Sequence, residues 1–224
     1  MKRFLQFTIL TFTLSATAAQ FKNLDFESAK PPKNPGFEDL SAAVALPSWH
    51  TFTGTVEEVS VLFKSTTTGS ARVKLGEFVP VSTQYGKYGV GLLSGGSIHG
   101  EGAVSAGIWQ AGDVPANART LLFDTSIDLS KTTGYRVSME GVTLSLQPVM
   151  TGMAGTDISA FAGKTVELRF ESLFEPAFGA FQVDFSLDNI RFSSVALVPE
   201  PSTWALLGVG GGLLFWVARR PKEM

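Results

Sequence analysis

The chain has 224 residues, a formal net charge of −2, 44% hydrophobic residues and no cysteine. Without cysteine there can be no disulfides or thiolate metal sites, so an exported form would have to depend on a sizeable apolar core. Residues 20–198 hold 13 Lys and Arg against 18 Asp and Glu, a net charge of −5. A mildly acidic central part without a basic cluster argues against nucleic acid as a partner.

The first 19 residues have the three parts of a secretory signal peptide. A basic start at residues 1–3 precedes a mostly apolar run at 4–14 and then small residues. Signal peptidase requires small side chains beside the cut, so we expect cleavage after Ala18 or Ala19. The alternative, an N-terminal membrane anchor, is disfavoured because the run is short and contains four polar residues.

The next segment is irregular and contains a near-repeat. Residues 23–27 read Asn-Leu-Asp-Phe-Glu and residues 34–38 read Asn-Pro-Gly-Phe-Glu, with two prolines between the copies. Proline is disfavoured inside helices and sheets. We therefore expect one copy to be part of the first strand and the other to form a neighbouring turn.

Short β-prone runs separated by Gly, Pro, Asn and Ser follow, and they predict eight or nine strands. The main runs are residues 56–63, 71–79, 88–93, 104–110, 119–124, 135–147, 165–170 and 181–192. Alternation is clear at Val166, Leu168 and Phe170, whose side chains should share one buried face. A single helical turn is expected at 157–163, ended by Gly163.

Many short strands without helices between them indicate two packed sheets with antiparallel pairing. The predicted fold class is therefore all-β. We expect an antiparallel β-sandwich of jelly-roll type over residues 20–197, preceded by the signal peptide and followed by a single hydrophobic helix.

The C-terminal tail combines a Pro-Glu-Pro triplet, an apolar segment and an arginine pair: Pro199, Glu200, Pro201, residues 204–218, Arg219 and Arg220. As a helix, the 15-residue apolar segment would be about 22 Å long, short of the roughly 30 Å of bilayer hydrocarbon. We expect it to insert in the membrane only transiently, with the arginines on the cytoplasmic side. An ordinary single-span anchor is the alternative, but it leaves the triplet unexplained.

The tail, at residues 198–222, resembles the PEP-CTERM sorting signal of Gram-negative bacteria that make exopolysaccharide. The resemblance implies that exosortase, an integral membrane enzyme, recognises the tail, cuts near the triplet and releases or transfers the protein outward. Signal peptidase and exosortase are then the expected partners during export. The expected location is the cell surface or the extracellular matrix.

Few residues suit catalysis. The chain has only two histidines, His50 and His99, and no Gly-x-Ser-x-Gly elbow. We expect His50 to be a surface or loop residue, assign His99 no role, and predict that the protein is not an enzyme. A two-carboxylate glycosidase remains an alternative, because Asp and Glu are plentiful and their separation depends on the fold.

The central part resembles carbohydrate-binding modules with a galactose-binding-like jelly roll. The resemblance rests on Asn-x-x-Phe-Glu at 34–38, a Pro-x-Trp turn at 47–49 and Leu-Asp-Asn-Ile at 187–190. It implies that a structural calcium ion is the one possible cofactor, because early and late carboxylates of such modules often hold calcium.

Carried onto this chain, the resemblance makes Glu38 and Asp188 the calcium ligands, with Glu27 as a rival for the place of Glu38. Hard oxygen ligands suit calcium and do not suit zinc. The alternative is that these carboxylates accept hydrogen bonds from backbone N–H groups in turns and at strand ends.

Aromatic side chains are the other candidates for ligand binding, because sugars stack on Trp and Tyr rings. The candidates are Trp49, Tyr85, Tyr88 and Trp109. Trp109 lies within a predicted strand and is expected in the core. Trp49, beside the proline turn, is expected to be a packing residue, and sugar stacking on Trp49 is the alternative.

The sequence therefore predicts an exported surface or matrix protein, a non-catalytic structural or adhesion module associated with exopolysaccharide. A calcium-stabilised carbohydrate-binding lectin and a secreted polysaccharide-acting enzyme are the alternatives.

Overall fold

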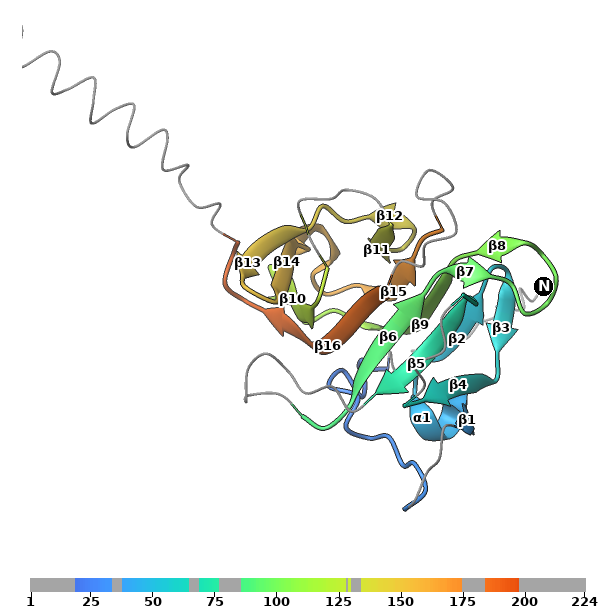
Figure 1. Cartoon of the computed structure of the whole chain (residues 1–224). Coiled ribbons are helices and arrows are strands. Elements are labelled where there is room, and N and C mark those ends of the chain that lie inside the picture. Colours follow the sequence, from blue (N-terminus) through green and yellow to red (C-terminus); the bar gives the residue numbers. More distant parts are fainter. Residues whose placement is uncertain are drawn as a thin grey trace, which may run out of the picture.

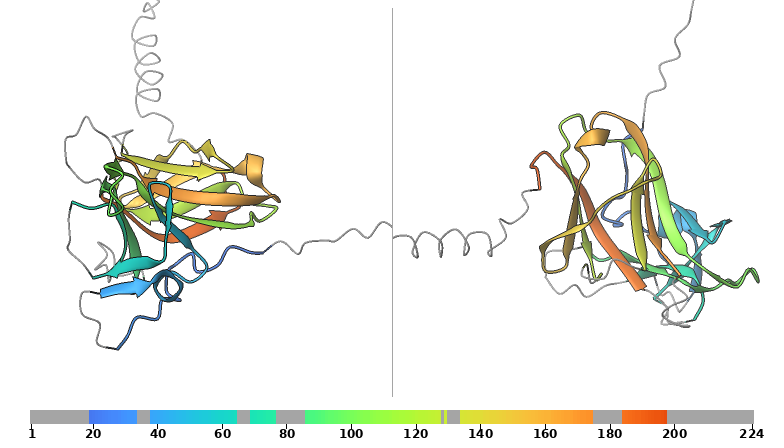
Figure 2. Two further views of the ribbon diagram at one scale, coloured as in Figure 1. Left: turned by 90° about the vertical axis from the view of Figure 1, so that its right-hand side faces the viewer. Right: turned by 90° about the horizontal axis from the view of Figure 1, so that it is seen from above.

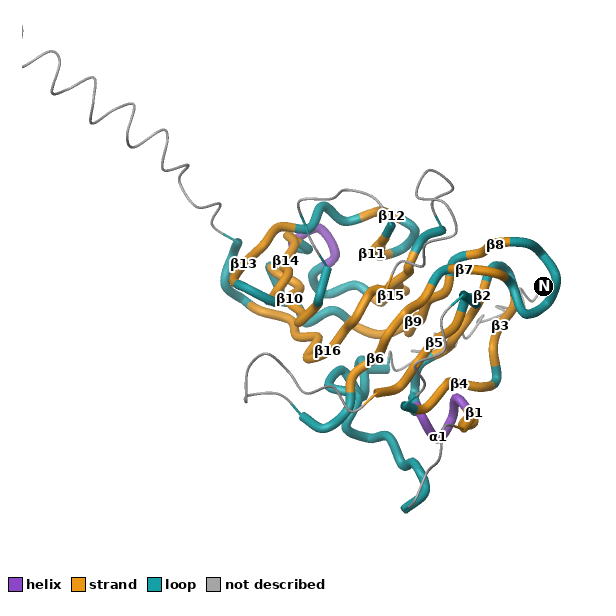
Figure 3. The backbone as a smooth tube through the Cα atoms, in the orientation of Figure 1, coloured by secondary structure: helices purple, strands orange, loops and turns teal. Residues whose placement is uncertain are grey.

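The computed structural model describes residues 19–33, 38–64, 69–76, 86–127, 129, 134–174 and 184–197. The predicted signal peptide, except for Ala19, and the predicted sorting tail lie outside these ranges. The strands are β1 (Glu38–Ser41), β2 (His50–Thr53), β3 (Val56–Glu58), β4 (Ser60–Phe63), β5 (Arg72–Gly76), β6 (Gly89–Leu93), β7 (Gly95–Gly96), β8 (Ala103–Val104), β9 (Ala106–Asp113), β10 (Thr120–Thr125), β11 (Tyr135–Met139), β12 (Val142–Thr143), β13 (Gln147–Met150), β14 (Met153–Asp157), β15 (Thr165–Ser172) and β16 (Asp184–Ser193). Two single helical turns, α1 (Ala42–Ala45) and the 3-10 turn η1 (Ser159–Phe161), are drawn in purple in Figure 3.

Two sheets pack face to face (Figures 1 and 2). The eight-stranded sheet has the order β1-β4-β5-β6-β16-β10-β14-β13, and the six-stranded sheet has the order β12-β11-β15-β9-β2-β3. Strands β5, β6 and β16 of the first lie against β2, β9 and β15 of the second. This confirms the predicted all-β sandwich. Pairing within the two sheets is antiparallel except between β4 and β5, which run parallel.

Buried aromatic rings fill the space between the sheets. Phe170 in β15 contacts Phe123 in β10 and Phe185 in β16, with ring centroids 5.3 and 6.2 Å apart. Trp49 packs edge-on against Phe170 at 6.3 Å and contacts Phe26 at 5.7 Å. Edge-to-face geometry of this kind stabilises aromatic pairs beyond the area that they bury. The predicted inward face of β15, with Phe170 on it, is confirmed.

The N-terminal segment, residues 19–33, crosses between the two sheets and is held by side chains and backbone. Gln110 accepts a hydrogen bond from the Lys22 N–H at 2.6 Å and donates one to the Lys22 carbonyl at 3.0 Å. The indole N–H of Trp49 donates to the Asn23 carbonyl at 2.9 Å. Phe26 is fully buried, so this segment contributes to the core and covers its edge.

The first copy of the near-repeat, around Asn23, forms turns as predicted. Of the second copy, only Glu38 lies within the described residues, and β1 begins there. The predicted helical turn near residue 160 is confirmed as η1, and it is followed by Gly163 with a φ of +73°.

The strand predictions were incomplete: two predicted runs are interrupted, and β2, β7, β14 and most of β13 lie outside every predicted run. The run 56–63 is two strands that belong to different sheets, and Val59 between them is 81% exposed. The run 135–147 is interrupted by a turn at Glu140 and Gly141, both with positive φ, a conformation typical of tight hairpins. Strand β14 was missed because its sequence, Met-Ala-Gly-Thr-Asp, has little β propensity.

Replacing Phe26 with alanine should lower the free energy of unfolding by about 3–5 kcal/mol, because it leaves a cavity where the N-terminal segment meets the core. Urea unfolding of the exported chain measures the change. Val59→Ala, at an exposed site, should change stability by less than about 0.5 kcal/mol. Equal effects of the two substitutions would show that the segment is not part of the core.

Candidate functional site

The outer face of the six-stranded sheet carries a cluster of aromatic, basic and acidic side chains, which we call the ring and arginine face. Its members come from adjacent strands β2, β9, β15 and β11 and are brought into rows by the antiparallel register. They are His50, Phe52, Trp109, Arg136, Glu167, Arg169 and Glu171.

The aromatic half of this face contains two stacked pairs of flat groups. His50 lies directly opposite Trp109 in the register, and the two rings stack with centroids 3.9 Å apart at an angle of 8°. Phe52 lies over Gly107, where a Cβ atom would come within 2.5 Å of the phenyl ring. The guanidinium of Arg169 lies 4.7 Å from the centroid of Phe52, a cation–π contact.

The charged half of the face is a chain of ion pairs. Arg169 donates to Glu167 at 2.9 Å and lies 3.9 Å from Glu171. Arg136 donates to Glu171 at 2.5 Å, and this hydrogen bond raises the pKa of Arg136. Because the Glu171 side chain is only 5% exposed, the two arginines supply the partners that a buried carboxylate requires.

Trp109 was expected in the core, and this prediction was wrong. Successive side chains of a strand point to opposite faces. Ile108 points inward and is fully buried, so Trp109 points outward and is half-buried. Sugar stacking on Trp49 was the alternative to packing, but this side chain is only 5% exposed and lies in the core, so it offers no surface to a sugar.

Of the two tyrosine candidates, the structure places only Tyr88. Tyr88 is 8% exposed and belongs to the core. Tyr85 lies outside the described residues.

A second cluster lies where the N-terminal segment passes β16. Asp188 in β16 lies opposite Asp124 in β10, and the register shifts next to this pair because β16 contains a bulge at Asn189. Asn189 has a φ of +48°; its N–H donates to Asp188 at 2.7 Å and its side-chain amide donates to Asp124 at 3.0 Å. Asp124 is 8% exposed, and its Oδ1 has no hydrogen-bond partner among the described residues.

Burial makes this acidic cluster hard to ionise. Desolvation raises the pKa of Asp188 to about 7, and the neighbouring charges of Asp124, Glu27 and Asp25 act in the same direction. Desolvation also raises the pKa of Asp124, against the effect of its hydrogen bond from Asn189. Two neighbouring carboxyl groups that are hard to ionise favour either their protonated forms or a bound cation.

The structure does not bring the two predicted calcium ligands together. Glu38 lies on β1, and four strand spacings separate β1 from β16 in the same sheet. At about 4.8 Å per strand the two backbones are roughly 19 Å apart. Glu27, the rival, is one of the charges that act on Asp188, and its Oε1 accepts a hydrogen bond from the Tyr88 N–H at 2.7 Å.

Within the described ranges no three His, Cys, Asp or Glu side chains gather closely enough to hold a metal ion. Calcium binding therefore stays a prediction, with Asp124 replacing Glu38 as the carboxylate beside Asp188. An open hollow of about 370 Å³ lies next to the cluster, lined by Phe21, Asn23, Leu24, Asp25, Asn189, Ile190 and Arg191.

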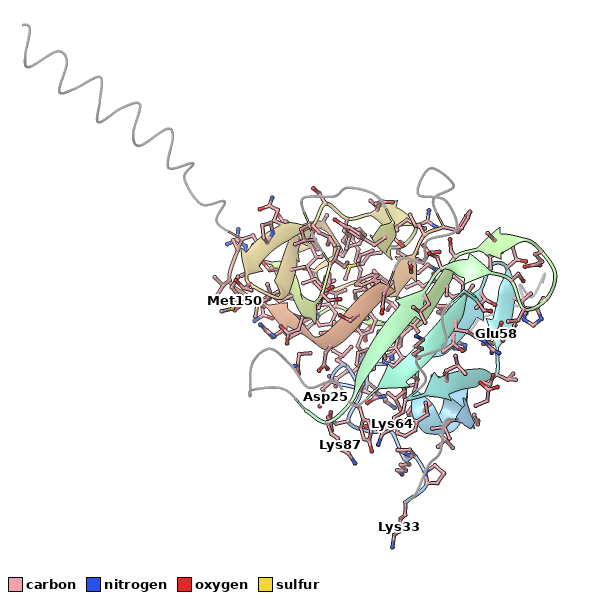
Figure 4. The ribbon with its side chains drawn as sticks, in the orientation of Figure 1. Asp25, Lys33, Glu58, Lys64, Lys87 and Met150 are labelled. Carbon is pink, nitrogen blue, oxygen red and sulfur yellow. The ribbon has the colours of Figure 1, made fainter. Side chains whose placement is uncertain are left out.

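Sequence reasoning missed a third constellation, around His99. Its Nε2 lies 2.8 Å from Glu58 Oε1, and the hydroxyl of Thr53 donates to the same oxygen. Glu58 is 8% exposed and is the last residue of β3, and it is labelled in Figure 4. The bond ties the loop between β7 and β8 to the sheet. Both contacts of Glu58 Oε1 therefore have a structural role. The sequence did not indicate the pair because 41 residues separate His99 from Glu58.

The C-terminal tail matches a known family model. Residues 197–220 match the family described as the PEP-CTERM protein-sorting motif, which includes the triplet and the arginine pair. The chain therefore carries a PEP-CTERM motif, and this motif supports export and sorting by exosortase. In the part of the chain that the structure describes, no helix has the length and apolarity needed to cross a membrane, and residues 204–218 lie outside that part.

The comparison with solved structures found similarity to the enzymatically active domain of tailspike protein 4 from bacteriophage CBA120. The sequence identity is 15%, the match covers 65% of this chain and 19% of the phage chain, and the TM-score is 0.37. The match therefore spans about a fifth of the phage chain. The search of curated proteins found no match.

The raised pKa of Asp188 predicts that stability falls as the pH rises. The unfolded carboxyl loses its proton near pH 4, while the folded one keeps it to about pH 7, so the stabilisation is complete below pH 4 and is lost through pH 7. Because Asp188 is partly exposed, screening should limit the loss to about 1–2 kcal/mol.

Urea unfolding at pH 4, 5.5 and 7.5 measures this loss in the wild-type chain and in the Asp188→Asn variant. The variant should lose much less stability over this range, since the amide does not titrate. Asp157→Asn, at an exposed carboxyl on β14, is the matched control. Parallel pH profiles of wild type and Asp188→Asn would contradict the assignment.

Proposed function

We propose that this protein is a non-catalytic surface module that its tail delivers to the cell exterior, where the ring and arginine face binds exopolysaccharide. The observation that carries the proposal is the half-exposed ring of His50 stacked on Trp109, beside the guanidinium of Arg169, which covers the buried ring of Phe52, on an outer sheet face. A sorted, exported protein meets the polysaccharide of its own cell first.

The chemistry of the face suits sugars. The apolar side of a pyranose packs on the faces of aromatic rings, while its hydroxyl groups bond carboxylates and guanidinium groups. Polar groups of the face are accessible: the side chains of His50 and Arg136 are 48 and 45% exposed, and that of Glu57, beside His50, is 65% exposed. His50 is also oriented, because its Nδ1 lies 2.7 Å from Glu57 Oε1.

The shape of the face favours a long chain over a single sugar. Its members follow rows across four neighbouring strands of one sheet. A polymer can contact such a row at several points, each of them weak. Both carboxylates of the charged half, Glu167 and Glu171, interact with Arg169, which supports binding over proton donation by this face.

Replacing Trp109 or Arg169 with alanine should weaken retention on the host's exopolysaccharide about three- to tenfold each, the effect of losing roughly 0.5–1.5 kcal/mol. Affinity electrophoresis in gels containing the purified polymer measures it. Arg119→Ala removes an exposed arginine from the other sheet and should leave retention unchanged. If the gel retains Trp109→Ala and Arg169→Ala as strongly as the wild type, the proposal is overturned.

A calcium-stabilised lectin is the second candidate, and the unpartnered Oδ1 of buried Asp124 favours it. A calcium ion would take this oxygen together with Asp188, and it would favour the ionised form of both carboxyl groups. Each carboxylate already accepts a hydrogen bond from Asn189, so a calcium ion would use the remaining oxygen positions.

Millimolar calcium should raise the melting temperature of the exported chain at pH 7.5 by several degrees, and a chelator should reverse the rise. Asp124→Asn should remove most of the calcium effect, whereas Asp157→Asn should keep it. A melting temperature that is the same in calcium and in chelator would reject the lectin candidate and leave the ring and arginine face untouched.

A further inference from the structure

We propose that the outer face of the eight-stranded sheet, beside the point where the tail leaves, is a membrane contact that rests on the lipid surface while the tail is inserted. We call it the exit patch. Its apolar members are Leu122, Val149, Met150, Val195 and Leu197. The exit patch and the ring and arginine face therefore lie on opposite sides of the sandwich.

The patch consists of apolar side chains, and several of them are exposed to solvent. Val149, Met150 and Val195 are 40, 58 and 70% exposed. They account for three of the seven large exposed hydrophobic side chains among the described residues. A concentration of this kind on an outer sheet face indicates an interaction surface.

The members form one continuous surface. A Cβ on Gly155 would lie 2.8 Å from Val149 Cγ2, 2.9 Å from Leu122 Cδ2 and 3.3 Å from Leu197 Cδ1, so these three side chains meet over the glycine. The register shifts between Pro148 and Met150, so that Met150 lies opposite Met153, which shares a face of β14 with Gly155.

The exit of the chain is fixed on this surface. The Thr120 hydroxyl donates to the Val195 carbonyl at 2.7 Å, and the Arg119 N–H donates to the Ser193 carbonyl at 2.8 Å. Residues 193–197 therefore lie along β10 and β14, and Figure 1 shows the last described residues close to β13. Figure 4 shows Met150 in the same region.

The distance to the bilayer follows from chain length. Six residues, 198–203, separate Leu197 from the apolar segment that begins at Trp204. Seven steps of at most about 3.6 Å limit the separation to about 25 Å. While the tail is inserted, the patch is therefore held next to the membrane, and the high local concentration makes even weak apolar contacts effective.

The charges at the rim fit an anionic lipid surface. Arg191 is exposed, and its guanidinium extends over Met153, with Nη2 3.0 Å from the sulfur. Arg119 is exposed on the other side, with Asp157 as its charged neighbour. Basic side chains around an apolar centre are typical of surfaces that bind anionic phospholipid. We therefore assign the bilayer, and not a protein, as the occupant.

The absence of cysteine from the chain allows a direct test. The chain without its signal peptide is made with one cysteine, Met150→Cys or Val149→Cys, labelled with a fluorophore, and reconstituted into vesicles of phosphatidylethanolamine and phosphatidylglycerol at a ratio of 3:1. Lipids with a nitroxide near the headgroup should quench either label at least threefold more than a label at Val59→Cys. Val59 is the matched control because it is exposed and adjoins Glu58, which Figure 4 shows far from Met150.

A second variant tests the chemistry. Val149→Asp in the Met150→Cys background should lower the quenching at least twofold, and Val59→Asp should leave it unchanged. Equal quenching at positions 150 and 59 would overturn the proposal, as would a chain that fails to float with the vesicles. Shielding that appears only after exosortase is added would also overturn it, in favour of a protein partner. None of these outcomes bears on polysaccharide binding, which uses the opposite sheet.

Discussion

Phe170 lies where the two sheets and the N-terminal segment converge. Trp49 packs against it from one side, and Phe123 and Phe185 pack against it from the eight-stranded sheet. Phe26 extends this contact into the N-terminal segment through Trp49. A chain without disulfides must hold its sheets together by such burial, so the positions of both outer faces depend on these rings.

Once the inner faces are committed to the core, the period of two along each strand determines what the outer faces carry. On the six-stranded sheet this produces stacked rings and ion pairs, and on the eight-stranded sheet it produces an apolar area beside the exit of the chain. The two faces point in opposite directions. A tail held in the membrane would therefore leave the ring and arginine face directed away from the bilayer.

The bulge at Asn189 has a different consequence. It places Asp188 beside Asp124 in a partly desolvated position. Burying two carboxyl groups together costs free energy unless they have partners. The asparagine supplies one hydrogen bond to each carboxyl group, and this compensates part of that cost. Such a site responds to protons, because burial raises the pKa of both carboxyl groups.

The sequence by itself determined the strand-rich character, the inward face of β15 and the sorting tail, because each is a local pattern that neighbouring residues define. Only the tertiary structure decided that β3 and β4 belong to different sheets, that Trp49 is buried while Trp109 faces outward, and that Glu38 lies far from Asp188. The reason is physical. Alternation shows that a strand has two faces, but which face is covered, and which strands adjoin, depends on contacts between residues far apart in the chain.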